Sequence, residues 1–518
     1  MPTVRDVTLD LLRRLGMTHI FGNPGSTELP MFRDYPDDIS YILGLQEATV
    51  VGMADGYAQA SRSAALVNLH SSAGVGHAMG NLFTAFKNQT PLVVTAGQQA
   101  RSILPFEPFL HADRPTEFPR PFVKWACEPA RAADVPRAIE RAYHVAMTPP
   151  FGPTFVSVPV DDWDQEGEAV EPRQIATANP GDPRALAQLA EALERAERPV
   201  IVLGAGASRD GAWDAAIRLA EALRAPVHVA PFACRNVFPE DHPLFAGFLR
   251  ASRKDIVETL SGHDVALVVG GPLNLYHTEA AGPHVPDGLN LWLVDDNPTV
   301  LSWAPSGTAI LANSRIALDY LAERIPASSR AAPPARTLLA RPQGDAITDR
   351  LAMHRVAALR PTESVIVEEA PSSRDAMHDF LPIVRADGFY TTARGGLGYA
   401  LPAAVGIAIA RPGERVIALI GDGSAMYSIQ ALFTASRLGS PLSVLVINNR
   451  RYEALESFGR HFGMGKVEGT DLSGLDFCAL AAGHGMAARR AETLEELDSA
   501  LKWSFAAEKP TLVEIVVA

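Results

Sequence analysis

Cysteine is scarce in this sequence of 518 residues: there are only three, Cys127, Cys234 and Cys478, and they lie far apart. Without cysteine pairs at metal-ligand or disulfide-framework spacing, the sequence predicts neither a zinc site nor a disulfide scaffold, and a reducing compartment is expected. Runs of Lys or Arg are also missing, and the net charge is −13. Because nucleic-acid surfaces need clustered positive charge, a nucleic-acid partner is not expected.

Long apolar runs are absent as well. No stretch reaches the roughly 18 uncharged apolar residues that cross a bilayer, so no membrane contact is expected. The N-terminal segment has Arg5 and Asp6 inside an amphipathic pattern and lacks an apolar signal core, which favours a cytoplasmic protein. Hydrophobic residues nevertheless make up 47% of the sequence, enough for several buried cores, so two to four domains are expected.

Short apolar runs, each as long as a buried strand, alternate with helix-length segments along the sequence. Thr3 is the predicted cap of a first helix that ends at Gly16, and residues 19–21 form the predicted strand that follows. The later predicted strands are residues 65–69, 92–95 and 154–158, then 200–203, 227–230, 266–269 and 291–294, and finally 364–367, 416–420, 443–447 and 512–517.

Two breaks divide this pattern into three segments: a polar stretch at residues 161–182, and residues 326–342, which are rich in Ala, Pro and Arg. The predicted fold class is therefore α/β, with three doubly wound parallel-sheet domains. Their predicted bounds are residues 1–162, 183–326 and 343–518.

Two polar motifs follow apolar runs in the third segment. Gly421-Asp422-Gly423-Ser424 ends the run 416–420, and Asn448-Asn449 ends the run 443–447. In a right-handed crossover, both ends fall on the carboxyl edge of the sheet, where such folds bind ligands. Asp422 and Asn449 offer hard oxygens suited to magnesium or calcium. The glycines allow backbone amides to approach a phosphate, and Ser424 adds a hydroxyl. Either motif alone is more often a plain turn or loop; the pair favours a metal and diphosphate site.

A glycine motif in the middle segment is weaker. Gly204-Ala205-Gly206 follows a predicted strand but lacks the third glycine of a dinucleotide fingerprint. A tight turn is the favoured interpretation. A nicotinamide-dependent dehydrogenase, which the doubly wound segments alone would allow, is disfavoured for the same reason.

The motif pair of the third segment resembles the cofactor signature of thiamine-diphosphate enzymes. This resemblance implies thiamine diphosphate as cofactor and magnesium, with calcium as the alternative, as its metal. It implies that the metal is bound by the side chains of Asp422 and Asn449 and by the backbone carbonyl of Arg451. The further cofactor-binding residues that it implies are Gly395, Leu397, Gly421, Gly423, Ser424 and Tyr452.

Glu47 follows the apolar run at residues 41–45, where a carboxylate is costly unless it has a partner, although a surface charge is the alternative. The resemblance implies that Glu47 protonates the aminopyrimidine ring and so activates the cofactor. Leu397, in Gly395-Gly396-Leu397-Gly398, resembles the bulky apolar residue that bends the cofactor, and the Gly395 carbonyl would accept its amino group. On its own, Leu397 would be assigned to a core.

Three further motifs resemble the benzoylformate decarboxylase branch of that family: residues 21–26 (FGNPGS), residues 68–71 (NLHS) and Tyr276-His277. The likeness implies that Ser26 binds the substrate carboxylate and that His70 and His277 move protons. Without it, Ser26 is equally well a helix N-cap, and the two histidines are no more remarkable than His111 or His284.

The implied reaction is non-oxidative decarboxylation of an aromatic 2-oxo acid, with benzoylformate, yielding benzaldehyde and carbon dioxide, as first choice. The implied enzyme is a carbon–carbon lyase and a homotetramer whose sites are shared between subunits. The implied substrate-pocket residues are Pro24, Leu110, Pro371, Thr391, Ala454, Leu455 and Phe458.

Departures from the branch pattern leave the substrate open. Pro371 and Thr391 replace a hydroxyl and an aromatic ring, and Arg394, Arg450 and Arg451 could bring positive charge to the entrance. A substituted ring or a branched 2-oxo acid therefore remains an alternative. So does a carboligase or aldehyde lyase on the same scaffold, while a catalytically inactive binding partner is disfavoured because Glu47, Asp422 and Asn449 are all present.

Overall fold

The computed structural model describes residues 1–337, 339–344 and 346–518. Contacts between residues divide the chain into two compact units. Unit 1 comprises Met1–Ile175, Pro342–Ala376 and Arg394–Ala518, and unit 2 comprises Ala176–Arg341 and Met377–Ala393. Within the described ranges, no helix has the length and apolarity needed to cross a bilayer.

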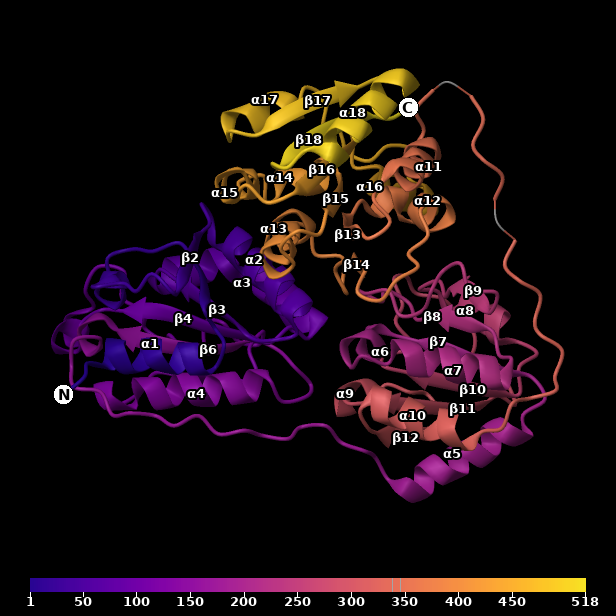
Figure 1. Ribbon diagram of the computed structural model, residues 1–518, viewed down its shortest axis with the longest axis horizontal. Helices are drawn as coiled ribbons and strands as arrows, with labels where there is room; N and C mark the ends of the chain where they lie inside the picture. The colour runs from indigo at the N-terminus through magenta and orange to yellow at the C-terminus, as the bar shows by residue number, and fades with distance from the viewer. Residues whose placement is uncertain (338, 345) are drawn as a thin grey trace. The chain divides into compact units, whose positions relative to one another are not determined.

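The first sheet of unit 1 is parallel and has helices on its faces (Figure 1). In spatial order its strands are β2 (Ser40–Leu43), β1 (His19–Gly22), β3 (Ala65–Leu69), β4 (Leu92–Gln98), β6 (Thr154–Pro159) and β5 (Ala126–Cys127). Its helices are α1 (Val4–Arg14), α2 (Glu47–Ser61), α3 (Ser71–Asn88) and α4 (Val135–Ala146), with 3-10 turns η1 (Leu29–Phe32), η2 (Arg101–Phe106), η3 (Ala132–Asp134) and η4 (Val160–Asp162). Thr3 caps α1 by accepting a hydrogen bond from the Asp6 amide, which confirms the predicted start of this helix.

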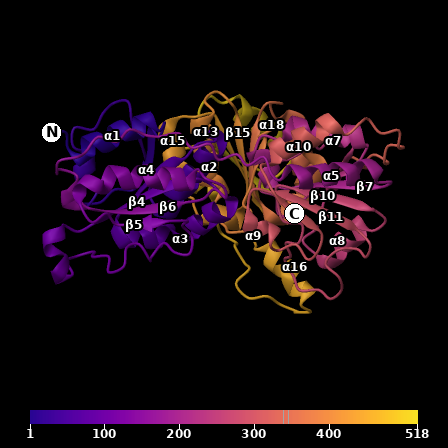
Figure 2. The same cartoon turned by 90° about the horizontal axis from the view of Figure 1, so that it is seen from below.

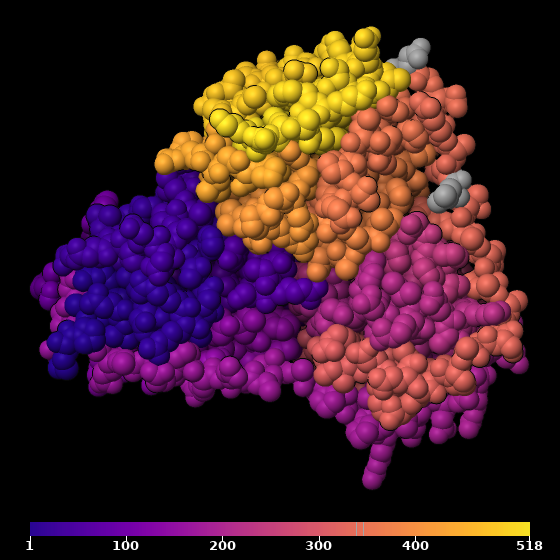
Figure 3. Space-filling view, viewed as in Figure 1, coloured from indigo at the N-terminus to yellow at the C-terminus, as the bar shows by residue number. Residues whose placement is uncertain are grey.

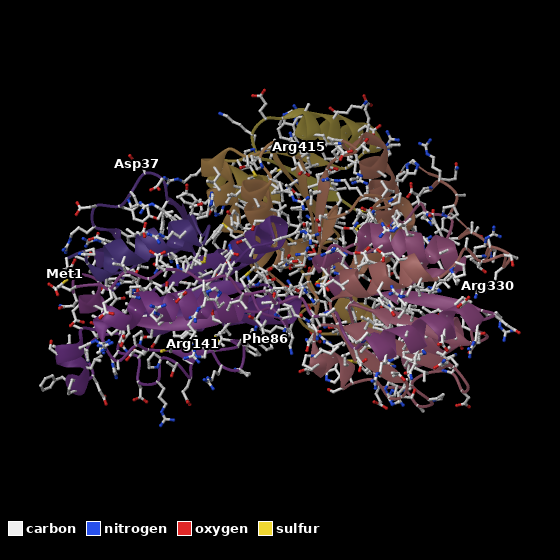
Figure 4. All side chains as sticks on the ribbon, turned by 60° about the horizontal axis from the view of Figure 1, so that its bottom comes forward. Met1, Asp37, Phe86, Arg141, Arg330 and Arg415 are labelled. Carbon is white, nitrogen blue, oxygen red and sulfur yellow. The ribbon has the colours of Figure 1, made fainter. Side chains whose placement is uncertain are left out.

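Unit 2 contains the second parallel sheet. Its strands, in spatial order, are β12 (Thr308–Leu311), β11 (Asn290–Asp295), β10 (Val265–Val269), β7 (Pro199–Leu203), β8 (Val227–Val229) and β9 (Phe245–Phe248). Its helices are α5 (Pro183–Arg195), α6 (Ala205–Arg209), α7 (Trp213–Leu223), α8 (Arg253–Leu260), α9 (Pro298–Leu301) and α10 (Ser314–Arg324). Arg330, labelled in Figure 4, donates to the carbonyls of Leu223 and Leu193 at the ends of α7 and α5, at 2.8 and 3.1 Å.

The third sheet, in unit 1, is also parallel. Its strands within unit 1 are, in spatial order, β13 (Val365–Glu369), β15 (Val416–Gly421), β16 (Leu442–Asn448), β18 (Thr511–Val516) and β17 (Ala487–Ala491). Its helices and turns are α11 (Asp349–Leu359), η5 (Pro371–Ser373), α13 (Ala400–Ala410), α14 (Asp422–Met426), α15 (Ala431–Leu438), α16 (Glu453–His461), α17 (Phe477–Gly483) and α18 (Leu494–Ala506). Figure 2 shows α16 extending away from these strands.

Helices α2 and α13 pack directly on each other inside unit 1. Glycines permit the close approach: a Cβ atom on Gly56 would overlap the backbone of Ala403, and one on Gly406 would overlap the carbonyl of Met53. The first and third sheets of unit 1 are therefore joined through a helix pair whose spacing depends on the absence of two side chains.

Residues 377–393 lie between two unit 1 segments in the sequence but pack within unit 2. This segment contains the end of α12 (Arg374–Phe380) and strand β14 (Phe389–Tyr390). The His378 ring lies 4.0 Å, centroid to centroid, from Phe248, and its Nδ1 lies 3.1 Å from the buried carboxylate of Glu240. The segment is thus fixed by contacts that are distant in the sequence.

The predicted α/β class with parallel sheets is confirmed, and each predicted strand corresponds to a strand of the structure, shifted by no more than a few residues. Among the strands that the sequence pattern missed, β5, β9, β12 and β17 lie at sheet edges. An edge strand is half solvated or very short, so it lacks the continuous apolar run that marks a central parallel strand. In β17 (AARRA), for example, most side chains are exposed.

Candidate active site

The two polar motifs of the third sheet emerge side by side. Strands β15 and β16 are parallel neighbours, and Gly421 is paired with Ile447 in their register. Asp422 and Asn448 are the next residues along each strand direction, so both motifs lie on the carboxyl edge of the sheet. This edge is where doubly wound folds bind ligands.

Asp422 has one carboxylate oxygen in use and one without a donor. Its Oδ1 accepts a hydrogen bond from the Gly423 amide at 2.7 Å, whereas its buried Oδ2 has no hydrogen-bond partner among the described residues. Burial raises the pKa of Asp422, and the neighbouring backbone amides of Gly423 and Arg450 oppose this shift. A buried carboxylate oxygen that lacks a donor is costly by itself but suits a cation, so the donor set fits Mg²⁺ or Ca²⁺.

The turn after β16 is held in one conformation. The side-chain oxygen of Asn449 accepts a hydrogen bond from the Arg451 amide at 3.1 Å, and Arg450 has a left-handed backbone with φ +61°. The ring of Tyr452 covers Gly423 so closely that a Cβ atom at Gly423 would overlap it. Ser424 is buried in α14. Because residue 423 is a glycine, the Tyr452 ring can lie directly against the backbone at this position.

The glycine loop before α13 is anchored by a carboxylate that the sequence reasoning missed. Glu369, at the end of β13, accepts hydrogen bonds from the backbone amides of Gly398, Tyr399 and Ala400 at 2.6 to 2.7 Å. Burial raises the pKa of Glu369 to about 7, against the opposing effect of these amides. The signal was available, because a carboxylate at the end of an apolar strand needs partners.

This loop adopts backbone conformations that favour glycine: φ is +69° at Gly395 and +96° at Gly398. Gly396 approaches the Thr84 hydroxyl of α3, which a Cβ atom would meet at 2.9 Å. Leu397 is half-buried rather than part of a core.

Glu47 is the first residue of α2 and is 7% exposed. Strand β2 ends at Leu43, so Glu47 begins a helix and does not continue the apolar run as an extended segment. Its Oε1 accepts a hydrogen bond from the side-chain Nδ2 of Asn23 at 3.2 Å, and its Oε2 lies 3.1 Å from Nδ1 of His77. The buried carboxylate thus has the polar partners that its position requires.

His70 lies at the end of β3, immediately before α3. Its Nδ1 is 2.8 Å from Oε2 of Glu28, a buried residue that the sequence reasoning did not single out. Glu28 also accepts hydrogen bonds from the backbone amides of Gly25 and Gly97, at 2.9 Å each. These fixed contacts orient the carboxylate, which in turn orients one nitrogen of the imidazole.

The turn at residues 23–28 links the surroundings of Glu47 and His70. Asn23 contacts Glu47, and Gly25 lies so near the His70 ring that a side chain there would overlap it. Ser26 is exposed within this turn, as is Pro24. The N-cap position of η1 is Glu28, so the structure does not support the alternative that Ser26 caps this turn of helix.

His277 and Thr391 belong to unit 2. The His277 amide donates to the Ala251 carbonyl at 2.9 Å, and its ring packs edge-on against Phe232, with centroids 5.7 Å apart. Thr391 is buried, and its amide donates to the carbonyl of Cys234 at 2.9 Å.

The other pocket candidates belong to unit 1. Pro371 begins η5, which contacts α16, the helix that carries Ala454, Leu455 and Phe458. Leu455 is 48% exposed, and Leu110 is half-buried with φ +60°.

The arginines after Asn449 differ in their surroundings. The Arg451 side chain forms an ion pair with Glu453 at 2.9 Å, which offsets its charge. Arg450 is exposed.

The middle glycine motif packs against the backbone of a neighbouring segment. Gly204 caps the short helix α6, and a Cβ atom on Gly204 or Gly206 would overlap the backbone of Gly270. These glycines allow two backbone segments to approach each other, and the motif begins a short helix where the sequence favoured a tight turn.

Comparison with known families gives three matches, each to a part of one family. Residues 2–114 match the N-terminal TPP binding domain of thiamine pyrophosphate enzymes, residues 186–321 match the central domain, and residues 372–515 match the C-terminal TPP binding domain.

Individual relatives match over the full length. The chain is 42% identical to a benzoylformate decarboxylase of Pseudomonas aeruginosa, over 99% of both chains. A 4-hydroxybenzoylformate decarboxylase of Rhodococcus jostii RHA1 superposes with a TM-score of 0.97 at 41% identity, covering 100% of this chain and 99% of that one. A benzoylformate decarboxylase of Polynucleobacter necessarius superposes with a TM-score of 0.98 at 38% identity and the same coverage.

Proposed function

Because the chain belongs to the thiamine pyrophosphate enzyme family, we propose that it is a thiamine-diphosphate-dependent decarboxylase of an aromatic 2-oxo acid. Benzoylformate, converted to benzaldehyde and carbon dioxide, is the first candidate substrate. The observation that carries this proposal is the 42% identity to a benzoylformate decarboxylase over 99% of both chains.

Magnesium is the proposed metal, with calcium as the alternative. The side chains of Asp422 and Asn449 and the carbonyl of Arg451 would bind it, because Asp422 offers a buried oxygen without a donor and the Asn449 turn is fixed. The diphosphate would lie against Gly421, Gly423 and Ser424, beside Tyr452. Gly395 and Leu397 would contact the ring system of the cofactor.

Thiamine diphosphate, when bound, supplies the electron sink for the bond that breaks. Glu47 would hold the proton that the aminopyrimidine needs. The side chains of Asn23 and His77 contact the two oxygens of this carboxylate, so its direction is set before any ligand arrives.

Ser26 would bind the substrate carboxylate and His70 would transfer a proton beside it. His70 is suited to this role because Glu28 holds its Nδ1, which leaves Nε2 as the nitrogen available to a ligand. His277 is proposed as the second proton carrier on the resemblance alone.

The proposed pocket walls are Pro24, Leu110, Pro371, Thr391, Ala454, Leu455 and Phe458. An apolar wall favours loss of the carboxylate charge over its retention. A ring-substituted substrate is the alternative. One structural relative is a 4-hydroxybenzoylformate decarboxylase. In addition, Pro371 and Thr391 change one proposed wall of the pocket.

The proposed domains are residues 1–162 for the aminopyrimidine, 183–326 in the middle, and 343–518 for the diphosphate and metal. We further propose a cytoplasmic homotetramer in which Glu47 of one subunit serves cofactor bound to another.

The test is carbon dioxide release from a panel containing benzoylformate, hydroxylated and carboxylated phenylglyoxylates, branched 2-oxo acids and pyruvate. We expect the aromatic acids to be turned over best. Glu47→Gln should reduce turnover by about 100-fold or more while cofactor affinity changes little, since it removes a proton relay and no phosphate contact.

A clear preference for pyruvate would contradict the aromatic substrate. Joining of aldehydes without carbon dioxide release would replace decarboxylation with carboligation as the activity. Unchanged turnover in Glu47→Gln would remove Glu47 from the mechanism.

A further inference from the structure

Asn448 has both ends of its side chain engaged, and it lies directly before the proposed metal-binding turn. Its Oδ1 accepts a hydrogen bond from the Arg450 amide at 3.0 Å. Its Nδ2 donates to Oε1 of Glu514 at 2.8 Å, across 66 positions of sequence. The conformation of the turn is therefore connected, through one side chain, to a carboxylate on the neighbouring strand β18.

Glu514 is almost fully buried, and its other oxygen is also paired. Nε of Arg490, on β17, donates to Oε2 at 3.0 Å, and the same guanidinium contacts Oδ1 of Asp476 at 3.1 Å. The side chains of Glu514, Arg490 and Asp476 are 2, 40 and 54% exposed. The paired charged side chains thus form a series that begins at the surface of unit 1 formed by β17, α17 and α18, yellow in Figure 3, and ends in the interior beside Asn448.

We propose that the chain Arg490–Glu514–Asn448 positions the turn at residues 449–451 for magnesium, with Glu514 as its central positioning residue. This inference rests on the proposed metal site. Residues that orient metal ligands without touching the metal commonly change its affinity by roughly 10- to 100-fold when replaced. A glutamate within the apolar strand β18 implies a buried polar partner, but the local sequence does not show that this partner is Asn448.

A metal at the cluster itself is the competing explanation. Ligand atoms of Asp476, Cys478 and Glu514 lie within 4.8 Å of one another. Burial raises the pKa of the Cys478 thiol to about 11, so it is protonated at neutral pH. Arg490 already contacts both carboxylates, and a guanidinium supplies the positive charge that a cation would otherwise bring.

Glu514→Gln is the decisive variant. The glutamine oxygen can accept from Asn448 or from Arg490, but its amino group then faces a second donor, so one of the two contacts is lost. We expect Mn²⁺ binding, measured by the loss of the free-ion electron paramagnetic resonance signal in the presence of thiamine diphosphate, to weaken ~10- to 100-fold. Arg490→Lys keeps the charge and should fall between Glu514→Gln and wild type.

A comparison of the affinities for Mg²⁺ and Ca²⁺ distinguishes misplaced metal ligands from a general loss of metal binding. Magnesium requires near-ideal octahedral geometry, whereas calcium tolerates irregular sites. Isothermal titration should therefore show that Glu514→Gln loses more affinity for Mg²⁺ than for Ca²⁺. Equal losses for the two ions would overturn the positioning role.

Asp162→Asn is the matched control, since Asp162 is a buried carboxylate that pairs with Arg101 at 2.8 Å beside the first sheet. It should destabilise the fold without changing metal affinity. Asp422→Ala tests the proposed site itself and should abolish metal-dependent cofactor binding.

If Asp422→Ala abolishes binding and Glu514→Gln leaves it unchanged, the positioning inference fails while the proposed site stands. If Asp422→Ala binds metal and cofactor with wild-type affinity, the proposed metal site itself is wrong. Stoichiometric Zn²⁺ that is lost in Cys478→Ser would show that the cluster is a metal site and would overturn the assignment to Arg490.

Discussion

At the scale of single residues, buried carboxylates determine which polar groups of unit 1 have a fixed direction. Glu28 has four partners: the amides of Gly25 and Gly97, the Thr27 hydroxyl and the His70 imidazole. An acid with this many donors is held in one orientation, and every partner gains a defined position. Loss of the charge should thus affect both stability and the geometry of His70.

Glu28→Gln is expected to lower kcat by up to ~100-fold with a smaller change in KM, because misdirection of His70 disturbs proton transfer more than substrate binding. The variant should also lose about 1–3 kcal/mol of stability, since the amino group of glutamine faces a donor. Steady-state kinetics and urea unfolding measure the two effects. Glu140→Gln, which changes a buried glutamate of α4, should lower stability alone. An equal loss of kcat in both variants would contradict a specific role for Glu28.

The stability of the protein should depend on pH through the buried carboxyl group of Glu369. Its pKa in the folded protein is about 7, raised by burial from an ordinary value of 4.5. Between these values the unfolded chain releases the proton while the folded chain keeps it, so stability falls as pH rises through this window and is constant above it.

Wild type should therefore lose about 3 kcal/mol of stability relative to Glu369→Gln between pH ~4.5 and pH ~7. The difference between the two proteins isolates this group, since every other titrating group is shared. Urea midpoints of both proteins at intervals of pH provide the measurement. A difference that is independent of pH would mean that Glu369 stays ionised, stabilised by its three amide donors.

At the scale of elements, helices α2 and α13 of unit 1 are packed too closely at two glycines to admit a side chain there. Helix α2 begins with Glu47, and α13 follows the glycine loop that contains Leu397, so a shift of either helix would displace one proposed cofactor contact, each at a different site of the proposed assembly. Because the helices meet at glycines, their approach is limited by backbone atoms, which cannot move aside as flexible side chains do.

Gly56→Ala should destabilise unit 1 by about 1–3 kcal/mol and weaken cofactor binding, because the new methyl group overlaps the Ala403 backbone. Gly80→Ala is the control, since Gly80 lies in helix α3 with open space around it. That change should be neutral or stabilise by up to about 1 kcal/mol through helix propensity. Thermal unfolding of both variants, with and without thiamine diphosphate, distinguishes them; equal effects would show that the contact is not limiting.

At the scale of the whole molecule, exposed aromatic side chains are consistent with the proposed assembly. Phe106 and Phe109 are 81 and 85% exposed in the single chain. Two large apolar side chains exposed so close together in the sequence commonly mark a surface that another protein covers.

We expect the active enzyme to be a tetramer, and at least a dimer, because a site shared between subunits is incomplete in a monomer. Light scattering at the concentration of the activity assay measures the mass of the active species. An active monomer would contradict the shared site. Phe106→Ser with Phe109→Ser should shift the mass toward smaller species and lower activity in parallel.

The sequence by itself determined the features that depend on local pattern. Apolar runs of strand length placed the central strands, and strand ends placed Asp422 and Asn449 on one edge, because parallel neighbours joined by a right-handed crossover leave no other arrangement. Motif resemblance added the family. Edge strands escaped because solvent on one side removes the apolar run that identifies a strand.

Only the tertiary structure decided which buried groups pair with one another. Glu28 meets His70 across 42 positions, and Glu514 meets Asn448 across 66. Neither pair leaves a mark in the sequence, since a hydrogen bond depends on atoms within about 3 Å and the chain reaches that distance only after its strands are ordered side by side. The sequence thus specifies which residues can do the chemistry, and the packing of the strands specifies which partners give them a direction.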